Sequence, residues 1–264
     1  MKRAATTWAL LILSSPILIL LGGAIIALCV STSASEFQKE LHNPVVQSAL
    51  WLSLKTTLIS LVIIAFCGTA LALLISRKRG LFGSALELLI TLPAIMPPSV
   101  AGIALLLAFG RRGLIGSYLD QHGITFGFSM IAVVMAQTFV STPFYVREAA
   151  TAFQSVDPSV RDAARLDGAD SFQMLRSVTL PITAPFLITG ALLAWARALS
   201  EFGATILFAG SLQNVTQTLP IAIYIGFETD LSQAKAIALI LLASAAALLL
   251  LLKVALRRSL VYAH

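Results

Sequence analysis

The amino-acid sequence predicts an all-α polytopic membrane protein with six transmembrane helices. Three observations favour this class: hydrophobic residues make up 58% of the chain, charged residues make up only 11%, and the mean hydropathy is +0.92. The apolar residues also form six long runs, each close to the roughly 20 residues that a helix needs to cross a bilayer core. We therefore expect residues 1–264 to form one transmembrane domain.

The first predicted span covers residues 8–30. A signal peptide is the alternative, because Lys2 and Arg3 precede the apolar run. The run is too long for one, and Leu28 before Cys29 is not the small residue that a cleavage or lipidation site requires. The other predicted spans cover residues 50–75, 85–108, 126–144, 181–209 and 234–252.

The second predicted span contains one charged residue, Lys55. We expect its ammonium group either to reach the outer surface or to add positive potential to an outer vestibule, meaning a water-filled entrance. Ser53, Thr56 and Thr57 would then line the same vestibule.

Prolines interrupt the third predicted span at Pro93, Pro97 and Pro98. Because proline lacks an N–H, the helix must kink or unwind there, which a bilayer tolerates only where the freed carbonyls face protein or a water-filled cavity. We therefore expect Pro97 and Ser99 to line a solute pathway. The alternative is a simple packing kink, since Ser99 also suits close helix contact.

Two arginines, Arg111 and Arg112, lie at the predicted outer end of the third span. A guanidinium suits either attraction of an anion or binding to carboxylates on a partner protein, and interfacial anchoring is a further alternative. We expect partner docking, because a permanent strong trap would release a bound anion slowly.

A polar island at residues 147–179 interrupts the apolar pattern. Asp157 followed by Pro158 is typical of a helix start, and Gly168 of a left-handed helix stop. Asp170 predicts a second start, with Gln173 able to complete a capping box. We expect residues 145–180 to form two short helices in a cytoplasmic loop between the fourth and fifth spans.

The fifth predicted span contains an ionisable pair, Arg197 and Glu201, four residues apart on one helix face. Either charge alone near the bilayer centre would cost about 2.5 to 3.5 kcal/mol, so the two side chains should pair or face water. With Thr205 they are pathway candidates. The alternative is that the pair stiffens the helix against a second copy of the chain without contacting the transported solute.

The distribution of Lys and Arg predicts the orientation in the membrane. With the N-terminus inside, only Lys39, Arg111 and Arg112 fall in outer loops. Both termini are then cytoplasmic, and the chain is expected in the cell (inner) membrane. The cytoplasmic set is Lys2, Arg3, Arg77, Lys78, Arg79, Arg147, Arg161, Arg165, Arg176, Lys253, Arg257 and Arg258.

The sequence contains no motif for several classes of function. It lacks a Gly-x-x-x-x-Gly-Lys-Ser/Thr phosphate loop, so any ATP hydrolysis should occur on a partner. His42, His122 and His264 are too scattered to predict a metal site, and no basic and aromatic interleaving predicts nucleic-acid binding. We expect neither a cofactor bound by this chain nor enzyme chemistry. A stand-alone secondary transporter or channel is the main alternative class, but the inverted repeats that it would predict are not evident.

The polar island resembles the Glu-Ala-Ala loop of ABC importer permeases, through Asp162-Ala163-Ala164, Gly168 and Val178-Thr179-Leu180-Pro181. Asp162 stands where the family usually has Glu, and Val178 where it usually has Ile. The resemblance implies the type I importer fold and a short helix that docks into a groove of a separate ATPase subunit, which binds ATP and Mg. The residues it implies for coupling are Asp157, Arg161, Asp162, Ala163, Ala164, Leu166 and Gly168.

Further segments, at residues 91–102, 110–116, 196–205 and 217–224, are similar to molybdate permeases, a group close to the tungstate and sulfate permeases. This resemblance implies a homodimer with the pathway at its two-fold axis, and an external binding protein that delivers a tetrahedral oxyanion. Molybdate is the expected substrate. Tungstate and sulfate or thiosulfate are the alternatives.

Overall fold

The computed structural model describes residues 2–77 and 80–261, so Lys78, Arg79 and His264 lie outside the described residues. Every regular element of this part is helical, which confirms the predicted class. The elements are α1 (Lys2–Ser31), α2 (Ala34–Leu41), α3 (Pro44–Arg77), α4 (Leu81–Ile95), α5 (Pro98–Phe109), α6 (Gly116–Gln121), α7 (Met130–Ser155), α8 (Pro158–Leu166), α9 (Ser171–Met174), the π-helical turn η1 (Leu175–Thr179), α10 (Leu180–Leu199), α11 (Gly203–Ala209), α12 (Leu219–Thr229) and α13 (Leu231–Val261).

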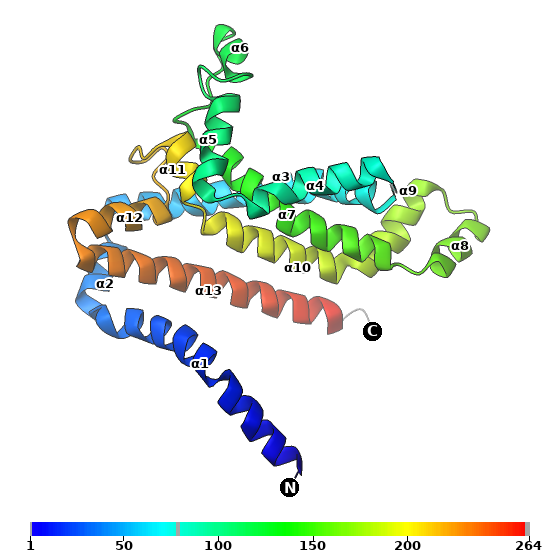
Figure 1. The fold of residues 1–264 in the computed structure, drawn as a ribbon, viewed down its shortest axis with the longest axis horizontal. Coiled ribbons are helices and arrows are strands. Elements are labelled where there is room, and N and C mark those ends of the chain that lie inside the picture. Colours follow the sequence, from blue (N-terminus) through cyan, green and yellow to red (C-terminus); the bar gives the residue numbers. More distant parts are fainter. Residues whose placement is uncertain (1, 78–79, 262–264) are drawn as a thin grey trace.

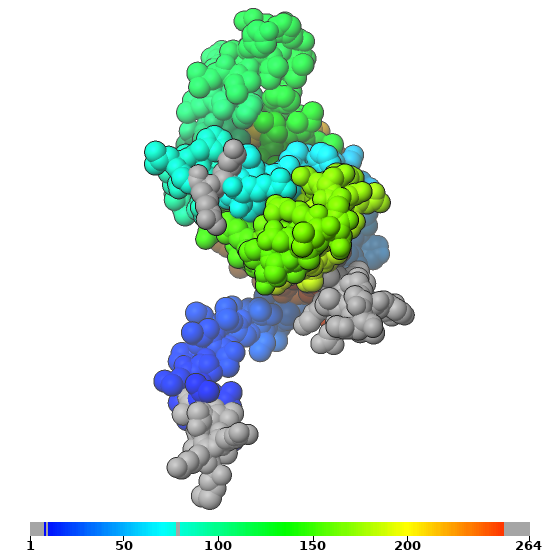
Figure 2. Space-filling model, turned by 90° about the vertical axis from the view of Figure 1, so that its right-hand side faces the viewer, coloured from blue at the N-terminus to red at the C-terminus, as the bar shows by residue number. Residues whose placement is uncertain are grey.

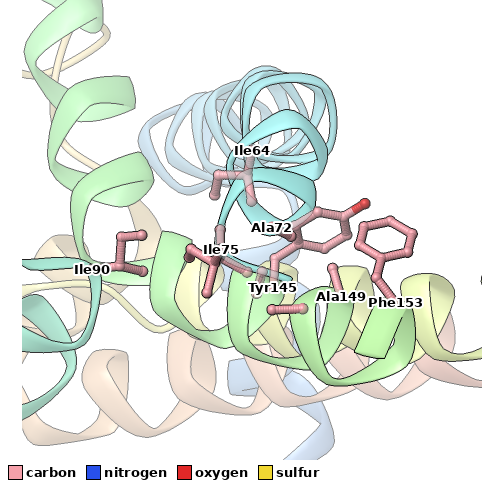
Figure 3. Close-up of a cluster of buried hydrophobic side chains, with 10 residues drawn as sticks. Ile64, Ala72, Ile75, Ile90, Tyr145, Ala149 and Phe153 are labelled. Atoms are coloured by element: carbon pink, nitrogen blue, oxygen red, sulfur yellow. The ribbon is translucent and has the colours of Figure 1, made fainter. Parts of the chain in front are cut away.

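The centre of the bundle is the packing of α7 against α3 and α10. Ile64 and Ala72 of α3 meet Tyr145 and Ala149 of α7 in a buried apolar cluster (Figure 3). A Cβ added at Gly68 of α3 would lie 2.9 Å from the Tyr145 ring, so the two helices approach too closely there for any larger residue. Close approach at small residues is the usual way for helices to associate in a membrane, where apolar burial offers little driving force.

The number of transmembrane spans is only partly confirmed. Among the described residues, four helical stretches are long and apolar enough to cross a membrane: Leu10–Ser31, Pro44–Arg77, Ser171–Leu199 and Leu231–Leu250. The bent pair α4 and α5 gives a fifth if it counts as one span. The predicted fourth span corresponds to α7, which is not among these stretches although it lies inside the bundle, and which buries the polar residues Gln137 and Ser141.

Two predicted spans, residues 85–108 and 181–209, are broken rather than continuous. The first breaks between α4 and α5, at Met96 and Pro97, with a bend of 117°. Pro93, also expected to disturb this helix, lies inside α4. The second span breaks after α10 ends at Leu199, and the chain resumes as α11. Figure 1 shows α5 running across the direction of the long helices, with α6 beyond it and α11 at its base.

The two ends of the bundle carry different elements (Figure 1). The loop with α8 projects from one end, toward which the start of α1 and the end of α13 also point. Helices α2 and α12 lie at the opposite end. Helix α1 leaves the bundle on its own, and none of the apolar window that marks it as a span is buried.

Candidate functional site

The projecting helix α8 has the start and the stop that the sequence predicts. The Asp157 carboxylate accepts a hydrogen bond from the Ser159 N–H at 2.8 Å, and Pro158 occupies the first turn. Hydrogen bonding from Ser159 favours the charged form of the carboxylate, so it lowers the pKa of Asp157 below its ordinary value of 3.8. At the other end Gly168 has φ of +83°, and the Ala169 N–H reaches back to the Ala164 carbonyl at 3.0 Å. This left-handed stop satisfies carbonyls that the helix end would otherwise leave free.

One side chain of α8, Arg161, is bonded to the end of α7, while several others are exposed. Arg161 donates through Nη2 to the carbonyls of Phe153 and Val156, at 3.1 and 2.7 Å, which ties α8 to the end of α7. Asp162, Ala163 and Leu166 are exposed, and Leu166 has 89% of its surface free. No residue of α8 is buried. The helix therefore presents a short, partly apolar surface to the outside, while Arg161 fixes it to the end of α7.

The second predicted short helix begins as α9 and continues without a break into α10. Asp170 forms the predicted capping box with Gln173 and starts α9, as expected. The chain then continues through η1, where the Leu180 N–H donates to the Leu175 carbonyl, five residues back. Pro181 cannot donate a backbone bond, and the wider π turn that precedes it lets the helix continue. Only Asp167, Gly168 and Ala169 lie between the end of α8 and the Asp170 cap. These three residues therefore join α8 to the helical stretch that leads into α10.

The two broken spans meet each other at their breaks. A Cβ added at Gly203, the first residue of α11, would lie 2.5 Å from the Pro98 Cβ at the start of α5. One added at Gly102 of α5 would lie 3.0 Å from the Ala204 Cα of α11. Helices α5 and α11 therefore pack backbone to backbone. Of the predicted pathway residues at this place, Pro97 and Ser99 are exposed.

The Glu201 carboxylate holds the break between α10 and α11 together. One oxygen contacts Arg197 Nη2 at 2.7 Å, and the other accepts a hydrogen bond from the Ala204 N–H at 2.6 Å. The predicted pairing is confirmed, but Glu201 follows the end of α10, so the expectation of one continuous helix face was wrong. Only 1% of Glu201 is exposed. Thr205 is fully buried, and its hydroxyl has no partner among the described residues.

The predicted vestibule around Lys55 is not formed by the three hydroxyl residues. Lys55 is exposed, whereas Ser53, Thr56 and Thr57 are buried. Ser53 accepts a hydrogen bond from the Leu219 N–H at the start of α12, at 2.8 Å. Thr56 and Thr57 donate to carbonyls of their own helix. Ser53 therefore joins α3 to α12 inside the subunit, and the two threonine hydroxyls are satisfied within α3.

The two arginines beyond α5 have different surroundings. Arg111 contacts Asp120 at 3.2 Å, and Thr125 donates to the same carboxylate at 2.8 Å. Thr125 and then Arg111 lower the pKa of Asp120. Arg112 is exposed and forms no ion pair within the described part of the chain. Of the two predicted docking residues, Arg112 is thus the free one.

Sequence reasoning missed a polar groove beside α7. Arg147 is exposed, and with Thr151 it lines two cavities beside α7, of about 320 and 110 Å³. Glu87 and Thr91 of α4 line the smaller one. The prediction ended the fourth span at residue 144, whereas α7 continues to Ser155. The stripe Val146, Ala149, Ala150 and Phe153 could have revealed this, because its spacing is helical.

Comparisons with known proteins agree with this arrangement. A family model described as "Binding-protein-dependent transport system inner membrane component" matches residues 64–260. The molybdenum transport system permease protein ModB of Mycobacterium tuberculosis is 43% identical over 217 residues, covering 82% of both chains. The sulfate transport system permease protein CysW of Synechococcus elongatus is 35% identical over 79% of this chain and 74% of its own.

Solved structures show the same fold at low identity. A bacterial ABC transporter for import of the acidic polysaccharide alginate contains a chain with a TM-score of 0.78, at 17% identity, covering 97% of this chain and 96% of that one. The family model matches residues 64–260, and the molybdenum permeases are 43% identical over 82% of the chain. The protein therefore belongs to the inner membrane components of binding-protein-dependent transport systems, which are the permease subunits of ABC importers, and within them to the molybdenum transport permease family.

Proposed function

We propose that this chain is the permease subunit of an ATP-driven importer that carries a tetrahedral oxyanion, and that the anion is molybdate. The observation that carries the import mechanism is α8, a capped helix held outside the bundle by Arg161 with Leu166 almost fully free. A stand-alone transporter or channel has no use for such a helix. The substrate rests on the relatives, because identity to the molybdenum permease is 43% and to the sulfate permease 35%. Tungstate and sulfate or thiosulfate are the alternatives.

The partners follow from two projections of the bundle, the loop with α8 and the arm of α5 and α6. A cytoplasmic ATPase subunit, which binds ATP and Mg, receives α8 through Asp162, Ala163, Ala164 and Leu166, while Asp157, Arg161 and Gly168 hold the helix in shape. An external oxyanion-binding protein docks near Arg112, on the projection formed by α5 and α6, with Arg111 held beside it by Asp120. Both termini then lie in the cytoplasm, and the chain spans the inner membrane several times.

Two copies of the chain form the pore, with lipid around them. Support comes from α1, whose span is entirely unburied within one subunit and so presents apolar surface to lipid or to a second copy. The pathway lies near the meeting breaks, where Pro97 and Ser99 are exposed. Arg197 and Glu201 hold α10 and α11 together beside this place, and Thr205 lies buried in α11. Lys55 adds positive charge on the outer half of α3.

Reconstitution tests the proposal directly. The permease, its ATPase and the binding protein are placed in vesicles, and uptake of molybdate, tungstate and sulfate is measured with and without ATP. We expect ATP-dependent uptake of molybdate above sulfate. Calorimetry on the binding protein provides an independent check, and a preference for sulfate in both measurements would overturn the substrate. Uptake without the ATPase subunit would overturn the importer class.

A further inference from the structure

A cavity of about 300 Å³ lies between the end of α3 and the loop that carries α8. Figure 2 looks onto this end of the molecule, where the end of α3 and the start of α4, in cyan, lie beside the green and yellow-green segment from α7 to α10. Three arginines line the cavity: Arg77 at the end of α3, and Arg161 and Arg165 on α8. The cavity thus adjoins both a long helix of the bundle and the projecting helix.

The lining is basic and rich in hydroxyl groups. Ser76, Ser171 and Thr179 complete its polar side, and none of the described lining residues is acidic. Arg165 shares its charge with Asp162, outside the lining, at 2.9 Å. Arg77 and Arg161 have no carboxylate partner in the described part of the chain. Positive charge therefore exceeds negative charge around this cavity.

Arg161 is held in a way that suits anion binding. Its Nη2 bonds to two carbonyls fix the guanidinium, while its Nε is buried without an acceptor among the described residues. A planar guanidinium also matches the geometry of oxyanions.

We propose that this cavity binds a compact tetrahedral oxyanion between Arg77 of α3 and Arg161 and Arg165 of α8, with the three hydroxyls as further donors. A soluble dianion and the phosphate of an anionic lipid share this chemistry. The bound anion links α3 to α8 and so restrains the helix that receives the ATPase. The site lies apart from the pathway and does not depend on which solute the protein carries.

The test measures amide hydrogen exchange in α8 in the complete complex with its ATPase, held in zwitterionic lipid discs. Molybdate, sulfate or phosphate is added and compared with chloride at equal ionic strength. A parallel sample contains phosphatidylglycerol without added oxyanion. At about ten times Kd, exchange that requires opening of the site should slow about tenfold. The variants are Arg77→Gln and, as a second one, Arg165→Gln. The control is Arg176→Gln, an exposed arginine of the same loop outside the lining.

Each outcome separates the possibilities. Slowing by an oxyanion in the wild type and in Arg176→Gln, but not in Arg77→Gln or Arg165→Gln, supports the site with a soluble anion. The same pattern with phosphatidylglycerol alone supports a lipid headgroup. No slowing by either source overturns the proposal, and this is also the result expected if a carboxylate of the ATPase fills the cavity. Equal slowing in Arg77→Gln and the wild type overturns it too. Failure of molybdate uptake in the same discs fused to vesicles would count against the transport proposal and leave this result standing.

Discussion

Glu201 contacts Arg197 at 2.7 Å across the point where α10 ends, and its second oxygen bonds the backbone of α11. The carboxylate therefore neutralises a charge and also caps the start of the next helix. This double use means that substitution of the two partners should have unequal effects.

Arg197→Leu should destabilise the subunit, because it leaves a buried carboxylate without its counter-charge. Breaking a buried pair costs about 3 to 5 kcal/mol, and the lower end applies here since 26% of the Arg197 side chain is exposed. Arg197→Leu with Glu201→Leu should be less harmful in thermal unfolding, because the uncompensated charge is gone. Glu201→Gln keeps an acceptor for the Ala204 N–H and serves as the matched variant. A double variant that folds normally yet transports as poorly as the worse single variant would show a role in transport itself.

Gly203→Ala should impair both stability and uptake. The added methyl would lie 2.5 Å from the Pro98 Cβ, so either α5 or α11 must shift, and overpacking of this kind costs about 1 to 3 kcal/mol. Gly127→Ala is the control, because an added Cβ there meets nothing within 4 Å. Thermal unfolding and uptake of the two variants should diverge. Equal behaviour would mean that the contact between the breaks is loose.

Gly168→Val should disturb α8 through the backbone alone. An added Cβ at Gly168 meets nothing within 4 Å, but its φ of +83° costs a β-branched residue about 1 to 3 kcal/mol. Uptake, stimulated ATPase activity and co-purification of the ATPase should fall together, while the variant still inserts. Gly168→Asn should retain more activity, because Asn tolerates positive φ. Full activity of Gly168→Val would remove α8 from the coupling mechanism.

The start of α8 should loosen in acid. The pKa of Asp157 is lowered in the folded protein by the Ser159 backbone bond, so its stabilisation is complete above the unfolded pKa and is lost as pH falls through the folded pKa. Hydrogen exchange in α8, corrected for intrinsic rates, should therefore accelerate below the ordinary Asp value of 3.8. Asp157→Asn still caps the helix and should lack this dependence. An unchanged acid response in Asp157→Asn would assign it to another group.

Labelling tests the orientation. Single cysteines at Ser117, on α6, and at Ser159, on α8, are introduced into a variant without Cys29 and Cys67. Both serines are exposed. In intact cells a membrane-impermeant thiol reagent should modify the cysteine at position 117 and spare the one at position 159, and permeabilised cells should label both. Labelling at position 159 from outside would reverse the orientation.

Local interactions account for what the sequence predicted well. The start and stop of α8, the capping box at Asp170 and the pairing of Arg197 with Glu201 all join residues within a few positions of each other, so spacing alone reveals them. The break after Leu199 carries no proline, and the same spacing that predicted the pair also suggested a continuous helix. Sequence periodicity does not report such a break.

Distant contacts account for what the sequence did not show. Ser53 bonds a backbone group 166 residues away, so its hydroxyl faces the interior of the subunit and not a vestibule. The prolines located the break between α4 and α5, but the bend of 117° depends on the packing of α5 against α11. Arg147 lines its groove because α4 lies beside α7, a neighbour that spacing along the chain cannot identify.

The contact of Gly203 with Pro98 and of Gly102 with Ala204 also limits how the outer part of the subunit can move. Because α5 and α11 touch through their backbones, neither can turn without displacing the other. They form one packed unit, which Met96 and Pro97 join to α4 and Ser200 to Phe202 join to α10. We therefore expect a displacement of α10 to displace α4 as well, because both are joined to the same packed unit.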